Sequence, residues 1–288
     1  MRKRKLEIAV VSDVHLGTIG CHAEELISYL NSIKPSILVL NGDIIDVWQF
    51  NKRYFPPSHL KVLKKIIGMA SNGTEIYYIT GNHDEVLRKF SGTTMGNINI
   101  VDKLVLNLNG KKAWFFHGDV FDLSVQNSKW LAKLGSYGYN LLIRLNRIIN
   151  WILSKLGRGK YSLSKRIKNS VKGAVKFVSN FEKTAVELAL ENGYDYVLCG
   201  HIHQPKKEVH ENKYGKCTYL NSGDWVENLT ALEYSFKRWK IYHYNQDKLS
   251  PFYADEDLKG MDMNELIASI VAKKSKQKKA KDGESIDE

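Results

Sequence analysis

The chain has 288 residues, of which 43% are hydrophobic, and it carries a net charge of +12. This length and apolar content support one large domain with a sizeable core, so no second domain is required. The three cysteines are widely spaced and odd in number, which argues against a disulfide framework and favours a reducing cytosol. Runs of about 18 uncharged apolar residues do not occur, which excludes an ordinary membrane-spanning helix.

The first segment, MRKRKLEIAVV, begins with basic residues and continues into a short apolar run. Residues 8–11 are too few to form the apolar region of a signal peptide, and they lead directly to Asp13. We therefore expect the first strand of the domain here, in a protein that folds in the cytoplasm.

Five apolar runs along the chain each end in a cluster of Asp, His and Asn. They are VVSDVH at 10–15, LVLNGD at 38–43, YYITGNHD at 77–84, AWFFHGD at 113–119 and YVLCGHIH at 196–203. Runs of β-branched and aromatic residues bounded by Gly and Asn predict buried strands. The polar clusters should therefore lie at the carboxyl ends of strands, where open α/β sheets bind their ligands.

The side chains in these clusters are those that bind divalent cations: carboxylate, imidazole and amide oxygen. The candidate ligands are Asp13, His15, Asp43, Asn82, His117, His201 and His203. Asp43 follows a glycine that lets the backbone bend, so one carboxylate can bridge two ions. Two ions about 3.5–4 Å apart can share a water, lower its pKa and clamp the oxygens of an in-line attack on phosphorus. This pattern predicts hydrolysis of a phosphoester or a pyrophosphate.

Each cluster by itself also has an ordinary explanation. A D-x-H sequence after a strand is often a turn or a helix cap, and N-G-D is a common turn signal. The occurrence of all five clusters in order, each after an apolar run, favours the metal site. Mn²⁺, Fe²⁺ and Zn²⁺ all accept this mixed set of oxygen and nitrogen ligands.

The series D-x-H, G-D, G-N-H-D, H-G-D and G-H-x-H resembles the calcineurin-like metallophosphoesterase superfamily over residues 6–245. The resemblance implies one metal site formed by Asp13, His15, Asp43 and His203, and a second formed by Asp43, Asn82, His117 and His201. It implies that His83 contacts the phosphate and helps to protonate the leaving oxygen, with Asp84 orienting it. The implied fold is a four-layer α/β/β/α sandwich.

Three longer stretches resemble a narrower group, the UDP-2,3-diacylglucosamine hydrolases. They are HGDVFD at 117–122, GHIHQP at 200–205 and NSGDW at 221–225. Such enzymes cleave the pyrophosphate of a lipid A precursor into UMP and 2,3-diacylglucosamine 1-phosphate, usually with manganese. Characterised members carry Arg in the sequence G-N-R-D, whereas this chain has His83 at that position. The resemblance implies two Mn²⁺ ions, with Fe²⁺ or Zn²⁺ as alternatives.

Residues 125–176 contain twelve Lys and Arg and no Asp or Glu, so this stretch accounts for the net charge of the whole chain. Between residues 141 and 156, Leu and Ile recur at helical spacing, with basic residues and Trp151 on the other side. Such a helix suits an anionic membrane surface or an acyl chain. The alternative is that the apolar stripe packs on the domain and the basic face is simply solvated.

A second helix, with Ser162 or Ser164 as its N-cap, is expected to continue to about residue 192. The two helices would form a cap insert, about residues 125–192, above the metal ligands. The expected substrate contacts are Asp122, Arg144, Arg147, Trp151, Lys165, Lys168 and Asp224. A purely structural turn around Asp224 is the alternative.

Seven strands are expected, near residues 6–12, 36–41, 75–80, 112–117, 194–199, 216–221 and 228–243, in a metallophosphoesterase domain of residues 1–250. Residues 251–288 would form a C-terminal extension, lysine-rich and disordered from about residue 272. It is either a solvated end or an additional attraction to anionic lipid.

Three functions are compatible with these features. The first is a pyrophosphate hydrolase of UDP-2,3-diacylglucosamine, peripheral on the cytoplasmic face of the inner membrane, for which we infer no protein partner. The second is a soluble phosphoesterase for a phosphoprotein, a cyclic nucleotide or a nucleic acid, although the Leu and Ile stripe disfavours nucleic acid. The third is a non-catalytic scaffold, which the complete ligand set disfavours.

Overall fold

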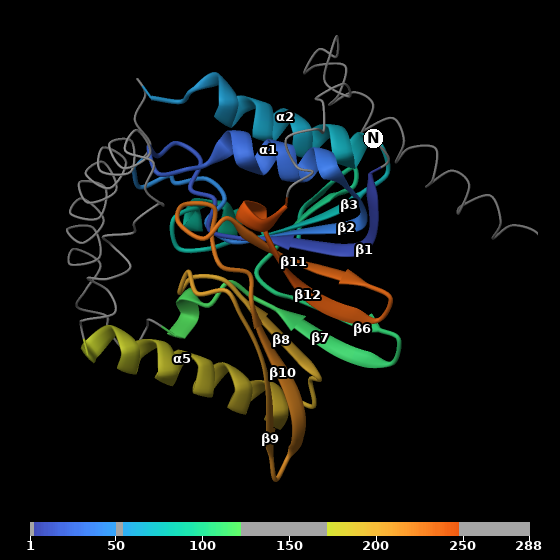
Figure 1. The fold of residues 1–288 in the computed structure, drawn as a ribbon, viewed down its shortest axis with the longest axis vertical. Helices are drawn as coiled ribbons and strands as arrows, with labels where there is room; N and C mark the ends of the chain where they lie inside the picture. Colours follow the sequence, from blue (N-terminus) through green and yellow to red (C-terminus); the bar gives the residue numbers. More distant parts are fainter. Residues whose placement is uncertain (1–2, 50–53, 122–171, 248–288) are drawn as a thin grey trace, which may run out of the picture.

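The structure is a computed structural model, and it describes residues 3–49, 54–121 and 172–247. Two sheets lie face to face (Figure 1). The first sheet has the order β12-β11-β1-β2-β3-β5-β4, and the second has the order β6-β7-β8-β10-β9. Strands β1, β2, β3 and β5 are parallel in the first sheet, as are β7, β8 and β10 in the second.

The first sheet consists of β1 (Arg4–Val11), β2 (Ile33–Asn41), β3 (Glu75–Ile79), β4 (Thr94–Met95), β5 (Ile98–Val101), β11 (Thr230–Ser235) and β12 (Arg238–His243). The second consists of β6 (Leu104–Leu108), β7 (Lys111–Phe115), β8 (Tyr196–Cys199), β9 (Lys206–Asn212) and β10 (Gly215–Asn221). The described helices are α1 (Ala23–Ser32), α2 (Pro57–Ser71) and α5 (Lys172–Glu191), with short 3₁₀ turns η1 (Glu85–Phe90) and η3 (Tyr244–Gln246).

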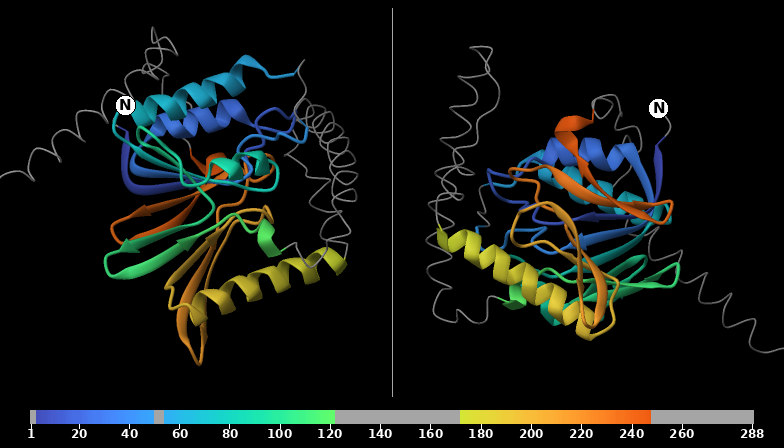
Figure 2. Two further views of the ribbon diagram at one scale, coloured as in Figure 1. Left: turned by 180° about the vertical axis from the view of Figure 1, so that it is seen from behind. Right: turned by 60° about the horizontal axis from the view of Figure 1, so that its bottom comes forward.

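Helices cover the outer face of each sheet, which confirms the four-layer α/β/β/α arrangement. Helices α1 and α2 lie on the first sheet and α5 lies on the second (Figures 1 and 2). Strand β1 shows why the chain folds in this way. Ile8 and Val10 belong to the core between the two sheets, whereas Ala9 and Val11 belong to the core beneath α1 and α2. Because both faces are buried from Ile8 onward, the second half of the strand is apolar without alternation.

Four strands were not expected, β4, β5 and β6 in the N-terminal half and β9 in the C-terminal half, and one expected segment is divided in two. The single segment expected at 228–243 is a hairpin of β11 and β12, with Phe236 and Lys237 at positive φ angles of 50° and 59° in the turn. Strand β9 was not expected, because its sequence, KKEVHEN, is mostly polar and gives no apolar pattern.

Most of the expected cap insert and the whole C-terminal extension lie outside the described residues. Helix α5 ends at Glu191, close to the end expected for the second cap helix. Among the described helices, none combines the length and the apolar character needed to cross a membrane.

Candidate active site

The predicted ligands gather where the parallel strands of both sheets end. Asp13, Asp43 and Asn82 follow β1, β2 and β3 of the first sheet, and His117 and His201 follow β7 and β8 of the second. The ligand atoms form three groups, each with its atoms within 4.8 Å of one another. The groups are Asp13, His15 and His203; His15, Asp43 and His83; and Asp43, His117 and His201. Asp43 and His15 each belong to two groups, so the three groups form one continuous site.

Backbone geometry marks the same residues. Asp13, His15, Asp43, His201 and His203 all have positive φ angles, between 52° and 65°. Residues other than glycine seldom adopt this left-handed conformation, and where they do, they concentrate at active sites. Hydrogen bonds between the loops hold it: the amide of His15 donates to the Asp43 carbonyl at 2.9 Å, and the amide of Asp13 donates to the Gly42 carbonyl at 3.1 Å.

The two central carboxylates are each oriented by the amide of a neighbouring loop. Asp43 Oδ1 accepts the His83 amide at 2.8 Å, and Asp13 Oδ2 accepts the His201 amide at 3.0 Å. Two glycines permit this proximity. A Cβ atom on Gly81 would lie 2.2 Å from Asp43 Oδ1, and one on Gly200 would lie 2.5 Å from Asp13 Oδ2. Any larger residue at either position would displace a carboxylate of the site.

The histidines present nitrogen lone pairs to a shared centre. His117 Nδ1 lies 2.9 Å from the carbonyl oxygen of Asn41 and must donate to it, which leaves Nε2 as an acceptor. That Nε2 atom lies 3.3 Å from Asp43 Oδ2. Two acceptors at this distance require a proton or a cation between them. Asn82 Oδ1 is likewise buried, without a hydrogen-bond partner among the described residues. These donor atoms fit a divalent cation.

Electrostatics supports the same conclusion. Burial disfavours the charged form of Asp43, but His117, His83 and His15 outweigh burial and hold the pKa of Asp43 well below its usual range. Burial also opposes protonation of His15, but Asp46, Asp43 and Asp13 outweigh it and raise the His15 pKa to about 9. The site is therefore built to stabilise positive charge beside its carboxylates.

Asp46 is a member of the site that the sequence reasoning missed. Its Oδ2 atom lies 2.9 Å from His83 Nδ1 and 3.1 Å from His15 Nδ1, so one carboxylate orients both rings. The Trp48 ring lies beside His83, with the ring centroids 4.4 Å apart. The signal available in the sequence was the spacing G-D-x-x-D at 42–46, which places Asp46 on the same loop as Asp43.

Asp84 does not orient His83 as we expected. It is fully buried, and its carboxylate accepts hydrogen bonds from the Gly81 amide at 2.6 Å, the Ile44 amide at 2.9 Å and the Tyr78 hydroxyl at 2.6 Å. Burial, followed by the nearby charge of Asp43, raises the Asp84 pKa. Because adjacent side chains leave the loop in different directions, Asp84 braces the backbone while Asp46 contacts the histidine.

The loop after β10 supports two of the predicted ligands. Asp224 is fully buried, and its Oδ1 atom accepts the amides of Val226 at 2.8 Å and Glu227 at 2.5 Å. It also contacts the Asn228 amide group, which in turn donates to the His203 carbonyl at 2.8 Å. The Trp225 amide donates to the Asp13 carbonyl at 3.1 Å. These contacts give Asp224 a role in shaping the loop; its contact with substrate stays a prediction.

The remaining predicted substrate contacts lie outside the described residues. They are Asp122, Arg144, Arg147, Trp151, Lys165 and Lys168. Near the site, Arg88 forms an ion pair with Asp119. The backbone carbonyl of Asn41 contacts Nδ1 of His117 and orients its ring.

Comparison with known proteins decides the family. The calcineurin-like phosphoesterase family matches residues 6–205, which is more than half of the chain. The chain belongs to the calcineurin-like phosphoesterase family. This calcineurin-like phosphoesterase is therefore a metal-dependent hydrolase, and the groups of Asp, His and Asn side chains described above are its candidate metal ligands.

Similar curated proteins carry a more specific name. The chain is 23% identical to a UDP-2,3-diacylglucosamine hydrolase of Aliivibrio fischeri, over 82% of this chain and 98% of that protein. It is 26% identical to one of Blochmanniella pennsylvanica, over 83% of this chain and 100% of that protein. Among solved structures, a dimetal phosphatase from Danio rerio is 11% identical and covers 82% of this chain and 95% of its own, with a TM-score of 0.40.

Proposed function

We propose that this phosphoesterase holds two divalent cations, one at Asp13, His15, Asp43 and His203 and one at Asp43, Asn82, His117 and His201. The observation that carries the proposal is the pair of atoms His117 Nε2 and Asp43 Oδ2, which face each other at 3.3 Å while His117 Nδ1 is engaged with a backbone carbonyl. Carboxylate, imidazole and amide ligands suit Mn²⁺, Fe²⁺ and Zn²⁺, and we propose Mn²⁺.

The bound ions would lower the pKa of a shared water and offset the charge that develops on the phosphate oxygens. The protein supplies the acid. Asp46 contacts Nδ1 of His83, so the other ring nitrogen faces away from Asp46. The His83 side chain is 15% exposed, and in this proposal its second ring nitrogen gives a proton to the leaving oxygen. Trp48 packs beside the ring and keeps it in place.

We further propose that the substrate is UDP-2,3-diacylglucosamine, cleaved to UMP and 2,3-diacylglucosamine 1-phosphate. The names of the similar curated proteins support this substrate. So does the basic stretch of residues 125–176, which combines positive charge with a Leu and Ile stripe. In this proposal the cap binds the lipid at an anionic membrane surface, with contacts from Asp122, Arg144, Arg147, Trp151, Lys165 and Lys168.

A second candidate is hydrolysis of a different phosphorylated substrate. It is favoured by His83, which occupies the position where characterised lipid A hydrolases carry Arg. A histidine held by Asp46 can donate a proton to many kinds of leaving oxygen, and it requires no acylated sugar nearby.

Turnover with Mn²⁺ in detergent tests both candidates. UDP-2,3-diacylglucosamine is compared with UDP-N-acetylglucosamine, which lacks the acyl chains, and with a chromogenic phosphodiester. We expect UMP from the acylated nucleotide alone. Cleavage of the diester without UMP from either nucleotide would select the second candidate. If wild-type protein loaded with Mn²⁺ cleaves none of the three substrates, the two-cation proposal is contradicted.

Two variants distinguish a role of the insert in lipid binding from a role in hydrolysis itself. Leu145→Asp and Ile149→Asp place a charge in the apolar stripe of the expected cap helix. Both should abolish cleavage of the acylated nucleotide and leave cleavage of the small diester unchanged. An equal loss on the two substrates would argue against a lipid role for the insert.

A further inference from the structure

The arginine in the turn η1 contacts both sides of the loop that carries His83. Arg88 lies at the far side of this loop, and its Nε atom donates to the Thr80 hydroxyl at 3.3 Å, on the near side. The guanidinium therefore closes the segment 80–88, which contains the candidate ligand Asn82 as well as the histidine. Supporting hydrogen bonds of this kind hold the side chains of a site in a fixed geometry.

The same arginine also reaches the loop after β7. Its Nη2 atom forms an ion pair with Asp119, which follows the candidate ligand His117 by two residues. The Asp119 side chain is 10% exposed and the Arg88 side chain is 38% exposed, so the pair lies partly out of water. Burial disfavours the charge of Arg88, but Asp119 outweighs burial and raises the Arg88 pKa. The guanidinium therefore stays charged in the folded protein.

This ion pair joins loops that belong to different sheets. The hydrogen bonds of the His83 backbone stay within the first sheet: its amide donates to Asp43 at 2.8 Å, and its carbonyl accepts the Val47 amide at 3.0 Å. Both partners lie on the loop after β2. Arg88 and Asp119 instead connect the loop after β3, in the first sheet, with the loop after β7, in the second. The pair is therefore a bridge across the two halves of the site.

We propose that Arg88 is a positioning residue for the reaction: through Asp119 it holds the loop of His83 at a fixed distance from the loop of His117. This inference rests on the proposed function, in which His83 is the acid. A water bonds to phosphorus and loses a proton to solvent, the bond to the leaving oxygen breaks, and that oxygen takes its proton from His83.

The distance between the two loops matters because of what each one carries. An acid must lie within about 2.6–3.2 Å of the oxygen that it protonates. In the proposed function, His117 helps to hold a cation that binds the phosphate, so its loop determines where the leaving oxygen lies. A displacement of about 1 Å between such groups can cost about a hundredfold in rate. The bridge from Arg88 to Asp119 therefore sets the reach of the acid.

The alternative is an ion pair that only contributes to the stability of the fold, as exposed pairs do to a small extent. The two roles have different consequences for the reaction. A misplaced acid slows the departure of strongly basic leaving groups most, because these need the proton most. A loss of stability or of bound metal lowers turnover on every substrate alike. The dependence of the rate on the leaving group therefore separates the two roles.

Two phosphodiesters with different leaving groups provide the test, with full-length protein loaded with Mn²⁺. Bis(4-nitrophenyl) phosphate releases nitrophenolate, a weak base that leaves without a proton, whereas diphenyl phosphate releases the more basic phenolate. We expect Arg88→Ala to lower kcat on diphenyl phosphate at least about tenfold and kcat on the nitrophenyl diester less than about threefold, with little change in KM. Equal losses on the two diesters, or no loss on either, would overturn the proposal.

His83→Ala, measured in parallel, distinguishes a failure of this inference from a failure of the proposed function. It should show the same preference more strongly, with a loss of at least about a hundredfold on diphenyl phosphate, the scale of general acid catalysis. If His83→Ala lowers kcat equally on both diesters, His83 is not the acid, and both the proposed acid and this inference fail. If His83→Ala shows the preference and Arg88→Ala does not, only this inference is overturned.

Further variants test whether the ion pair itself is responsible. Asp119→Ala removes the pair from the other side and should cause the same selective loss as Arg88→Ala. The double variant should lose no more than either single variant, because two residues that act through one contact are not additive. Selective losses that add in the double variant would overturn the proposal.

Lys89→Ala is the matched control for the loss of a positive charge. Lys89 is exposed on the same turn, and its ammonium lies over the Phe90 ring. Its removal should change kcat on both diesters less than about twofold, since exposed charges contribute little. A selective loss in Lys89→Ala equal to that in Arg88→Ala would assign the effect to the charge of the turn and overturn the role of the ion pair.

Arg88→Lys provides a second variant in case Arg88→Ala fails to fold. Lysine keeps the charge beside Asp119 but offers a single ammonium in place of the guanidinium fork. We expect its loss on diphenyl phosphate to lie between those of wild type and Arg88→Ala, at an unchanged melting temperature and Mn²⁺ affinity. A loss on both diesters that follows a lowered melting temperature or Mn²⁺ affinity would identify a purely structural role and overturn the proposal.

Discussion

The two ends of β1, β2 and β3 differ in the side chains that gather there. At the carboxyl ends, carboxylates, imidazoles and an amide face one another, so each charge has a partner of opposite sign or a hydrogen bond nearby. At the amino ends, the described contacts join helices to strands: the Thr74 hydroxyl, in the turn after α2, donates to the Pro35 carbonyl of β2 at 3.0 Å. Buried apolar residues of the strands lie between the two ends. The difference follows from strand direction, because parallel strands bring the loops that carry the candidate ligands to one edge of the sheet.

The largest effect is expected from removing the shared carboxylate at the carboxyl end. Asp43→Ala should lower turnover on every phosphoester at least about a thousandfold, as expected when a central electrostatic group of an active site is lost. Added Mn²⁺ should then no longer raise the melting temperature by its wild-type amount. Turnover near the wild-type rate would contradict a bridging role for Asp43.

The two ends of β3 give a matched pair of glycine substitutions. Gly81→Ala would place Cβ 2.2 Å from Asp43 Oδ1, whereas Cβ on Gly73, at the other end of the strand, would meet nothing within 4 Å. We expect Gly81→Ala to lower the free energy of unfolding by about 3 kcal/mol and to impair turnover. Gly73→Ala should cost about 1 kcal/mol through its positive φ angle alone, without loss of turnover. Urea denaturation measures the free energy of unfolding, and a diesterase assay measures turnover. Equal effects of the two substitutions would contradict a special requirement for glycine at position 81.

Asp46 tests whether orientation of the histidines matters as much as their presence. Asp46→Asn keeps the size of the side chain and removes its charge beside His83 and His15. We expect turnover to fall about 10–100-fold, because the carboxylate that orients both histidine rings has lost its charge. Asp102→Asn, whose carboxylate contacts Thr80 outside the site, serves as the control. Equal turnover in Asp46→Asn and Asp102→Asn would show that Asp46 does not orient the histidines for the reaction.

The smallest effect concerns the loop that supports His203. Asn228 and Asn192 each donate a side-chain hydrogen bond to a backbone carbonyl at 2.8 Å, the first to His203 and the second to Leu188 at the end of α5. Asn228→Ala should weaken Mn²⁺ binding about tenfold, since partners that orient a ligand affect affinity on this scale. Asn192→Ala should leave it unchanged. Equal metal affinities in the two variants would show that the loop does not position the ligand.

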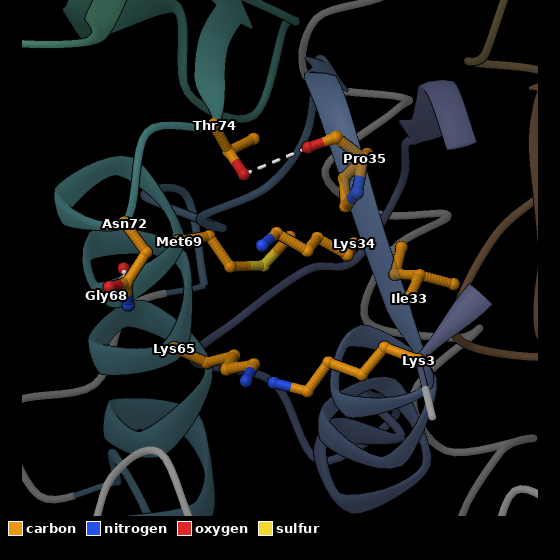
Figure 3. A pocket seen from close by; sticks show the side chains of 9 residues that line it. All are labelled: Lys3, Ile33, Lys34, Pro35, Lys65, Gly68, Met69, Asn72 and Thr74. Atoms are coloured by element: carbon orange, nitrogen blue, oxygen red, sulfur yellow. Dashed lines mark hydrogen bonds between the residues drawn. The ribbon is translucent and has the colours of Figure 1, made fainter. Parts of the chain in front are cut away.

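The sequence by itself determined the family, the four-layer fold and the order of the candidate ligands, because apolar runs ending in Asp, His and Asn are local signals. Only the tertiary structure showed that Asp46, rather than Asp84, contacts His83, since neighbouring side chains leave a loop in directions that no local pattern encodes. Strands β4, β5, β6 and β9 were all missed, and β9 shows why most clearly: its residues are mostly polar, and its pairing with β10, not an apolar pattern, makes it a strand. The cavity beside Lys34, Met69 and Thr74 (Figure 3) was not predicted either, because its lining residues lie far apart along the chain and only the packing of α2 against the first sheet brings them together.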